Sequence, residues 1–247
     1  MQVRGVTKSF GARRVLDDIE FEIQPRRVTA LLGPNGSGKT TLMKISLSLM
    51  EADRGDVFWD GSRYRELERP LNKVGALLDV NAAHPGRSAL NHLWALGLTH
   101  GVSKKRAMEL LDKVGLASVA KKRVSTYSLG MKQRLGIAAA LVGDPDYLIF
   151  DEPTNGLDVD GLIWFRELLF ELVAEGKTIL YSSHSIDEIE KTSHDLRVIG
   201  QGKLLFSGST KEFKGLVLAD ALDHALQDFE SAYAAFIRSA LDYVAVK

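Results

Sequence analysis

A chain of 247 residues has room for one large domain, or for one domain with a small appendage. Its apolar fraction of 45% and charged fraction of 26% are typical of a globular protein with a sizeable core, and the absence of cysteine excludes disulfides, thiolate metal sites and cysteine nucleophiles. The 32 basic side chains balance the 32 acidic ones, so the chain lacks the overall positive charge expected of a nucleic-acid-binding protein.

The first 32 residues are predicted to be rich in β-strand. They enter a strand-like pattern directly, without a signal-peptide core, and no apolar run in the chain is long enough to cross a bilayer. If the protein works at a membrane, a separate chain must therefore hold it there. Phe10 is predicted to lie in a loop before Gly11, where its ring would either anchor the core or stack on a nucleobase.

The most informative segment is Gly33 to Thr40, which has the spacing Gly, four residues, Gly-Lys-Thr. It follows the β-prone residues 28–32 and precedes a helix predicted over 39–50. Its glycines allow backbone N–H groups to converge on a phosphate, the Lys39 ammonium can reach the outer phosphates, and the Thr40 hydroxyl can bind Mg²⁺. The alternative is a glycine-rich turn that only caps a helix.

Two short strands are predicted at 57–59 and 73–78, and the second leads into Asp79. The pattern then changes to helical period. We interpret a segment of about 82–140 as a helical subdomain inserted in an α/β core, and its last helix is predicted from Ser128 to about residue 142.

Residues 147–150 are four apolar residues without alternation, which predicts a central strand buried on both faces. Asp151 and Glu152 follow at its carboxyl end, where open α/β sheets bind their ligands. Since neighbouring residues of a strand point to opposite faces, one carboxylate would hold Mg²⁺ and the other would polarise a water molecule.

Another buried strand is predicted at 178–183, after an amphipathic helix at 162–175. It ends in His184, which either hydrogen-bonds a terminal phosphate or is a structural or surface histidine. A hairpin is predicted around Gln201 and Gly202.

Residues 214–247 are predicted to form an amphipathic helical extension of a domain that covers 1–213. The apolar stripe of this helix would either pack on its own domain or pair with a second copy or a partner chain. Its apolar members are Leu222, Leu226, Phe229, Tyr233, Phe236, Ala240 and Tyr243.

Six motifs in order resemble those of the ATP-binding subunit of ABC transporters, over about residues 2–213. Gly33 to Thr40 is similar to the Walker A loop, 147–152 to the Walker B strand, and 155–158 to the D-loop. Residues 127–134 lie where the family signature belongs. His184 resembles the switch histidine, and Phe10 the adenine-stacking aromatic.

The resemblance implies an α/β P-loop NTPase core, with a mixed or parallel sheet and flanking helices, an N-terminal antiparallel β subdomain and the helical insert. It implies an ATPase that uses ATP and Mg²⁺, with Glu152 and His184 as catalytic residues. The implied magnesium ligands are Thr40, Asp79 and Asp151. The implied nucleotide contacts are Phe10, Gly33, Pro34, Asn35, Gly36, Ser37, Gly38, Lys39, Thr40, Thr41, Asp79, Ser128, Gly130 and Asp158.

Three positions depart from the commonest family pattern: Leu129 and Met131 in the signature, and Asp79 in place of a glutamine. These departures are similar to those of the branch that serves bacitracin-, lantibiotic- and drug-type exporters, which favours export. The alternatives are an importer subunit and a soluble ATPase regulator of translation or DNA repair.

The resemblance also implies partners. In this family, the residue that corresponds to Ser128 faces the nucleotide of another subunit, so we expect a homodimer that holds two ATP molecules. We expect a transmembrane permease to dock in the groove between Asp79 and Trp94, and we expect no nucleic-acid partner.

Overall fold

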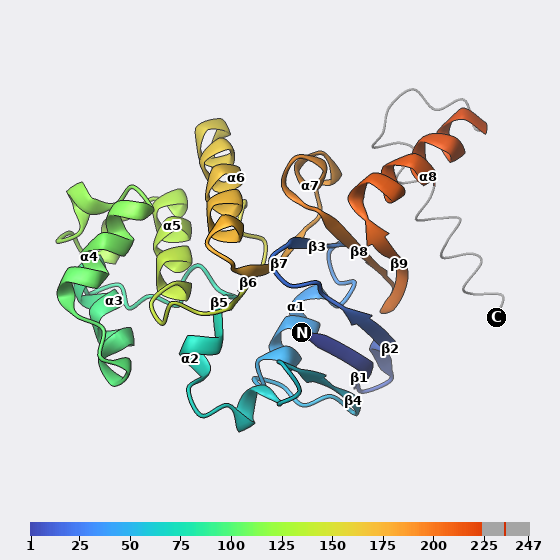
Figure 1. The fold of residues 1–247 in the computed structure, drawn as a ribbon, viewed down its shortest axis with the longest axis horizontal. Coiled ribbons are helices and arrows are strands. Elements are labelled where there is room, and N and C mark those ends of the chain that lie inside the picture. Colours follow the sequence, from blue (N-terminus) through green and yellow to red (C-terminus); the bar gives the residue numbers. More distant parts are fainter. Residues whose placement is uncertain (224–234, 236–247) are drawn as a thin grey trace. The chain divides into compact units, whose positions relative to one another are not determined.

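The computed structural model describes residues 1–223 and residue 235, and the chain divides into two compact units (Figure 1). The terminal unit is formed by Met1–Glu66 together with the chain from Ser182 onward, and the central unit by Leu67–Tyr181. None of the helices in the described part of the chain is both long and apolar enough to span a bilayer.

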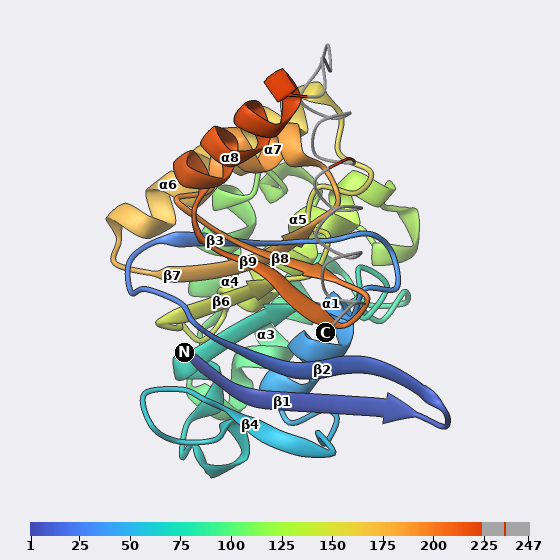
Figure 2. The same cartoon turned by 90° about the vertical axis from the view of Figure 1, so that its right-hand side faces the viewer.

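The terminal unit contains an antiparallel sheet in the order β2-β1-β4 (Figure 2), which confirms the predicted N-terminal β subdomain. A second group of strands pairs β3 parallel to β8, and β8 antiparallel to β9 around Gln201 and Gly202, as the predicted hairpin requires. The strands are β1 (Gln2–Phe10), β2 (Arg13–Glu22), β3 (Val28–Leu32), β4 (Arg54–Phe58), β8 (Asp195–Gly200) and β9 (Lys203–Ser209). The helices are α1 (Lys39–Ser46), α7 (Ile186–Thr192) and α8 (Thr210–Asp223).

The turn between β8 and β9 contacts β2. The Asp17 N–H donates to the Gly202 carbonyl oxygen at 2.8 Å, and a Cβ added to Gly202 would lie 2.6 Å from the Val15 carbonyl oxygen. A Cβ added to Gly38 would lie 2.8 Å from that same oxygen. Two loops therefore press on one peptide of β2, and neither has room for a side chain at the point of contact.

The central unit contains the parallel strands β5 and β6 and, as far as Tyr181, β7, with β6 in the middle. All four residues of β6 are buried, as its unbroken apolar run predicted. Helices α3 and α4 pack on each other and both contact α5. The elements are α2 (Pro70–Lys73), β5 (Val74–Leu77), α3 (Ala89–Gly97), α4 (Lys104–Lys113), α5 (Leu129–Ala140), β6 (Tyr147–Phe150), α6 (Val159–Ala174) and β7 (Thr178–Ser183).

Several predicted boundaries were wrong. Helix α1 ends at Ser46 rather than near residue 50, because Ser48 adopts a positive φ of 53° that stops the helix. Helix α6 begins at Val159 rather than residue 162, because the Asp158 carboxylate caps it by accepting from the Gly161 N–H at 2.8 Å. Phe10 is the last residue of β1 and not part of a loop.

The predicted C-terminal stripe lies outside what the structure describes, apart from the backbone of Leu222 in α8. The extension over 214–247 stays a prediction.

Candidate functional site

The phosphate loop, Gly33–Thr40, connects the buried strand β3 to α1. The Ser37 N–H donates to the Pro34 carbonyl oxygen at 3.2 Å, and Gly36 and Gly38 adopt φ angles of +80° and +108°. Such left-handed turns in a glycine-rich loop point consecutive N–H groups toward one anion. The N-terminus of α1 continues this set of donors, because no side chain caps it.

Packing requires two of the loop glycines. A Cβ added to Gly33 would lie 2.2 Å from the Ile199 carbonyl oxygen and 2.6 Å from Ser37 Oγ. A Cβ added to Gly38 would lie 2.6 Å from Leu16 Cδ2. The loop is therefore a cradle of bare backbone, held against β2 and β8.

Two buried polar groups of the cradle fit a phosphate. Lys39 is only 6% exposed, and its Nζ donates to the carbonyl oxygens of Gly33 at 2.6 Å and Pro34 at 3.3 Å, so the ammonium is held at the loop. The Ser37 hydroxyl is buried and has no hydrogen-bond partner in the described part of the chain, which costs about 1–3 kcal/mol. Phosphate oxygens would partner this hydroxyl and attract the ammonium more strongly than neutral carbonyls do.

Thr40 and Thr41 lie in the first turn of α1, and Thr40 is exposed. Its hydroxyl is the kind of hard oxygen ligand that Mg²⁺ prefers. Among the described residues, no cluster of three His, Asp or Glu side chains is placed to hold a metal ion. A magnesium ion here would therefore depend on phosphate and water oxygens for most of its ligands.

Phe10 and His184 also belong to the terminal unit. Phe10 is 49% exposed, with Lys8 Nζ 5.7 Å from its ring centroid, so the interpretation of this ring as a core anchor is wrong. His184 follows β7 and is exposed. The turn that presents it is fixed by the Ser185 N–H, which donates to Ser183 Oγ at 3.0 Å.

In the central unit, the acidic pair follows β6. The Asp151 N–H donates to the Leu77 carbonyl oxygen at 2.8 Å, which ties the ends of β5 and β6 together. Glu152 adopts a positive φ of 48°, which is uncommon for a residue with a Cβ. The premise that Asp151 and Glu152 belong to the strand was wrong, because both residues lie beyond the end of β6.

Gln133 is a residue that the sequence analysis missed. It is 3% exposed on α5, and its Nε2 donates to the Glu152 carbonyl oxygen at 3.2 Å. The bond connects the signature helix to the strained turn. A glutamine on the buried face of a helix was the available signal, because buried amides are almost always hydrogen-bonded to something.

The signature and the D-loop contact each other within the chain. The Ser128 hydroxyl caps α5 by accepting from the Met131 N–H at 3.2 Å. A Cβ added to Gly156, which has a φ of +79°, would lie 2.3 Å from Leu129 Cδ2, and one added to Gly130 would lie 3.2 Å from the Gly156 carbonyl oxygen. Leu129, the unusual leucine of the signature, therefore packs against Gly156 of the D-loop, although Leu129 is 51% exposed.

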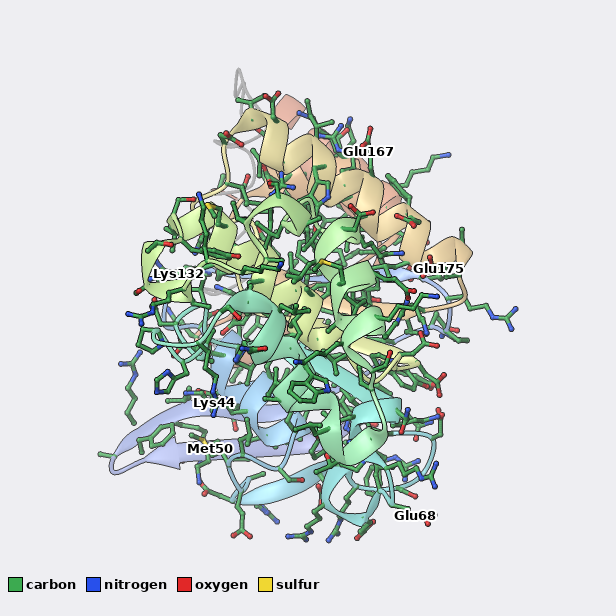
Figure 3. The ribbon with its side chains drawn as sticks, turned by 90° about the vertical axis from the view of Figure 1, so that its left-hand side faces the viewer. Lys44, Met50, Glu68, Lys132, Glu167 and Glu175 are labelled. Atoms are coloured by element: carbon green, nitrogen blue, oxygen red, sulfur yellow. The ribbon has the colours of Figure 1, made fainter. Side chains whose placement is uncertain are left out.

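Asp79 stabilises the turn that follows β5. Its Oδ1 accepts from the Asn81 N–H at 2.8 Å, and its carbonyl oxygen accepts from the Ala82 N–H at 3.2 Å. A hollow of about 180 Å³ lies beside this turn. It is lined by Val80, Asn81, Ala83, Pro85, Val124, Ser125 and Lys132, the last of which is labelled in Figure 3.

His92 is a buried titratable group of the central unit. It lies in α3, is 8% exposed, and its Nδ1 has no hydrogen-bond partner within residues 1–223. Burial lowers the pKa of this imidazole, and the positive charge of Arg87 and the nearby His84 lower it further. The folded chain therefore favours the neutral form of His92.

The predicted site residues fall into two sets. Phe10, residues 33–41 and His184 belong to the terminal unit. The other set belongs to the central unit and consists of Asp79, Ser128, Gly130, Asp151, Glu152 and Asp158. That both sets meet at one nucleotide stays a prediction.

The family model described as ABC transporter matches residues 16–155. The chain belongs to this family, as an ATP-binding subunit. It is 37% identical over 215 residues to the lantibiotic transport ATP-binding protein SrtF of Streptococcus pyogenes, covering 87% of this chain and 92% of the relative. It is 39% identical over 208 residues to the bacitracin transport ATP-binding protein BcrA of Enterococcus faecalis, covering 83% of this chain and 68% of that relative.

The fold is also that of solved cassettes. A dimeric post-hydrolysis state of the ATP-binding cassette MJ0796 bound to ADP and Pi matches with a TM-score of 0.77 at 24% identity, over 85% of this chain and 98% of that one. The predicted α/β class with a P-loop NTPase core is confirmed. The resemblance to the bacitracin and lantibiotic branch is confirmed by the two relatives.

Proposed function

We propose that this chain binds and hydrolyses ATP with Mg²⁺, and that it powers export through a separate membrane permease. The observation that carries the proposal is the cradle after β3. It combines backbone donors, a buried ammonium at Lys39 and a buried hydroxyl at Ser37 that has no partner among the residues that the structure describes. These groups suit the β- and γ-phosphates of a nucleotide.

The acidic turn supports the hydrolysis step. Glu152 would accept a proton from a water molecule as that water attacks the γ-phosphorus, and His184 would hydrogen-bond the terminal phosphate. Bound Mg²⁺ would neutralise phosphate charge. The residues proposed to hold it are Thr40, Asp79 and Asp151, whose oxygens are ligands of the type that Mg²⁺ prefers.

A second copy would complete each site. Ser128 begins α5 at an exposed position, where its hydroxyl and the adjacent N–H groups can bind the phosphates of a nucleotide held by the other copy. The solved cassette MJ0796 is dimeric in its state with ADP and Pi, which supports this arrangement. ATP would then favour the closed dimer because only that state contacts the nucleotide from both sides.

The permease would dock at the hollow beside Asp79. The hollow joins apolar side chains to the Lys132 ammonium, which donates to Asn81 Oδ1 at 3.4 Å. Docking there would place the chain on the cytoplasmic face of the membrane. The direction of transport is proposed from SrtF and BcrA, whose names specify lantibiotic and bacitracin transport. The departures at Leu129, Met131 and Asp79, which favour export, support the same direction.

The test is the Glu152→Gln variant, with Glu167→Gln as its control. Glu167 is exposed on α6, as labelled in Figure 3, and its substitution makes the same change of charge. We expect Glu152→Gln to lower ATP turnover on the order of 100-fold or more while ATP binding is retained, because a lost general base costs about that much. Wild-type turnover in Glu152→Gln would contradict the role of Glu152, and a wild-type protein that binds no Mg·ATP would contradict the whole proposal.

A further inference from the structure

The hairpin of β1 and β2 pairs the exposed Phe10 with a basic residue, Arg13. Phe10 and Arg13 are direct partners in the register of these antiparallel strands. Directly opposed residues of an antiparallel pair project from the same face of the sheet. The guanidinium of Arg13 and the ring of Phe10 therefore leave the hairpin on one side.

Arg13 reaches the phosphate loop from that side. Its Nη2 lies 3.5 Å from the Gly36 carbonyl oxygen, and a Cβ added to Gly36 would also lie 3.5 Å from Nη2. Within the described part of the chain, this is the one polar contact of Arg13. The contact joins the end of the hairpin to the middle of the cradle.

The contact between Arg13 and Gly36 is weak and does not explain why an arginine is placed at this position. A separation of 3.5 Å is at the limit of hydrogen bonding, and the group is exposed, so its net contribution to stability is small. A guanidinium has five N–H donors and binds phosphate oxygens in charge-assisted pairs that are about twice as strong as neutral hydrogen bonds. An arriving phosphate would therefore displace the carbonyl at little cost.

We infer that Arg13 is a nucleotide contact that binds the phosphate nearest the ribose. The inference rests on the proposed function, with the base on Phe10 and the outer phosphates in the loop. The ribose and its α-phosphate must lie between the base and the loop, and Arg13 extends from the strand position opposite Phe10 to the Gly36 carbonyl oxygen. Since ATP and ADP share this phosphate, Arg13 strengthens the binding of both equally and does not change the rate of the chemical step.

Arg14 provides a matched control. It neighbours Arg13, is also exposed, and its substitution removes the same charge. Its side chain belongs to the opposite face of β2, where Nη1 donates to Asp17 Oδ1 at 2.8 Å. A general effect of positive charge on nucleotide binding would be equal for the two arginines.

The experiment measures the Kd of ATP, ADP and adenosine for the full chain and for Arg13→Ala and Arg14→Ala, together with the turnover number at saturating ATP. We expect Arg13→Ala to weaken ATP and ADP by the same factor, about tenfold or more, because hydrogen bonds to charged groups are worth that much. We expect no change for adenosine, an unchanged turnover number, and effects below about twofold for Arg14→Ala.

Three results would overturn the inference: equal effects of the two substitutions, a loss for ATP without one for ADP, or an equal loss for adenosine. If Arg13→Ala does not fold, Arg13→Gln gives the same comparison, because it keeps a polar side chain of similar reach and removes the charge. A wild-type chain that binds neither ATP nor ADP would contradict the proposed function itself. Tight wild-type binding without an effect at Arg13 would contradict this inference alone.

Discussion

The phosphate loop after β3 and the acidic turn after β6 both follow a buried strand, but they are built from different parts of the chain. The loop after β3 exposes backbone, and its positive φ angles fall on Gly36 and Gly38. The turn after β6 carries the half-buried side chains of Asp151 and Glu152, and its positive φ falls on Glu152. A site made of backbone can place glycine wherever the chain must bend, whereas a site made of side chains must accept strain at the residue whose chemistry it needs.

The largest effect should come from adding one methyl group to the backbone site. Gly38→Ala would carry a positive φ and a Cβ 2.6 Å from Leu16 Cδ2, so the loop must shift. Strain and overpacking together cost about 3 kcal/mol, which corresponds to a loss of ATP affinity on the order of 100-fold. The measurement is the Kd of ATP, with circular dichroism to verify the fold.

Gly61→Ala is the control for this comparison. Gly61 also adopts a positive φ, of 90°, but nothing lies within 4 Å of its added Cβ. It should cost about 1 kcal/mol of stability and leave ATP affinity unchanged. If Gly38→Ala bound ATP as well as Gly61→Ala does, the loop would not be the rigid cradle described above.

An intermediate effect tests whether the acidic turn stores strain. At Glu152, glycine should give a more stable protein than alanine, by about 1 kcal/mol, because only glycine adopts the positive φ without a steric cost. The free energy of unfolding in urea, measured for Glu152→Gly and Glu152→Ala, gives the difference directly.

The same pair of substitutions at Glu167, inside α6, should give the opposite sign. Alanine is favoured over glycine there by about 1 kcal/mol, since the position is helical. If alanine were the better residue at both positions, the comparison between a relaxed loop and a strained turn would fail.

The smallest effect concerns the pH dependence of stability, which should differ between the two units. The pKa of His92 is lowered in the folded chain, so below about pH 6.5 the unfolded chain takes up a proton that the folded chain refuses. The stabilisation from neutral His92 is complete above that pH and is lost as the pH falls toward the lower folded pKa. Hydrogen exchange at pH 7.5 and 5.5 should show protection falling in the central unit more than in the phosphate loop.

His92→Phe should reduce this pH dependence, because it removes the titrating group and keeps a ring in the buried position. The remaining dependence would come from other titrating groups. A His92→Phe variant with the same fall in protection as the wild type would remove His92 as the cause.

Local pattern was enough to predict the buried strand at 147–150 and the phosphate loop, whereas the strand predicted at 57–59 is β4 at Arg54–Phe58. The unbroken apolar run of 147–150 predicted a buried strand because a strand buried on both faces shows no alternation. The residue types and spacing of Gly33 to Thr40 were themselves sufficient to predict a phosphate-binding loop. The order of the motifs along the chain was sufficient to identify the family, which the comparisons confirmed.

Features that depend on distant residues could not be predicted in the same way. The bond from Gln133 to Glu152 joins positions 19 residues apart, and no local pattern specifies it. The positive φ of Glu152 is imposed by its surroundings against its own preference. Phe10 was assigned to a loop because Gly11 follows it. In the structure, Phe10 pairs with Arg13 of β2 and is therefore the last residue of β1.

The turn at Gln201 and Gly202 has a practical consequence for anyone who modifies this protein. A short turn between antiparallel strands is normally a permissive place to insert an epitope, a fluorescent label or a peptide linker. Here the Gly202 carbonyl oxygen holds the Asp17 N–H, and Gly202 lies against the Val15 peptide on which Gly38 also presses. A tag placed in this turn would disturb the nucleotide cradle through β2, so fusion partners should be attached elsewhere.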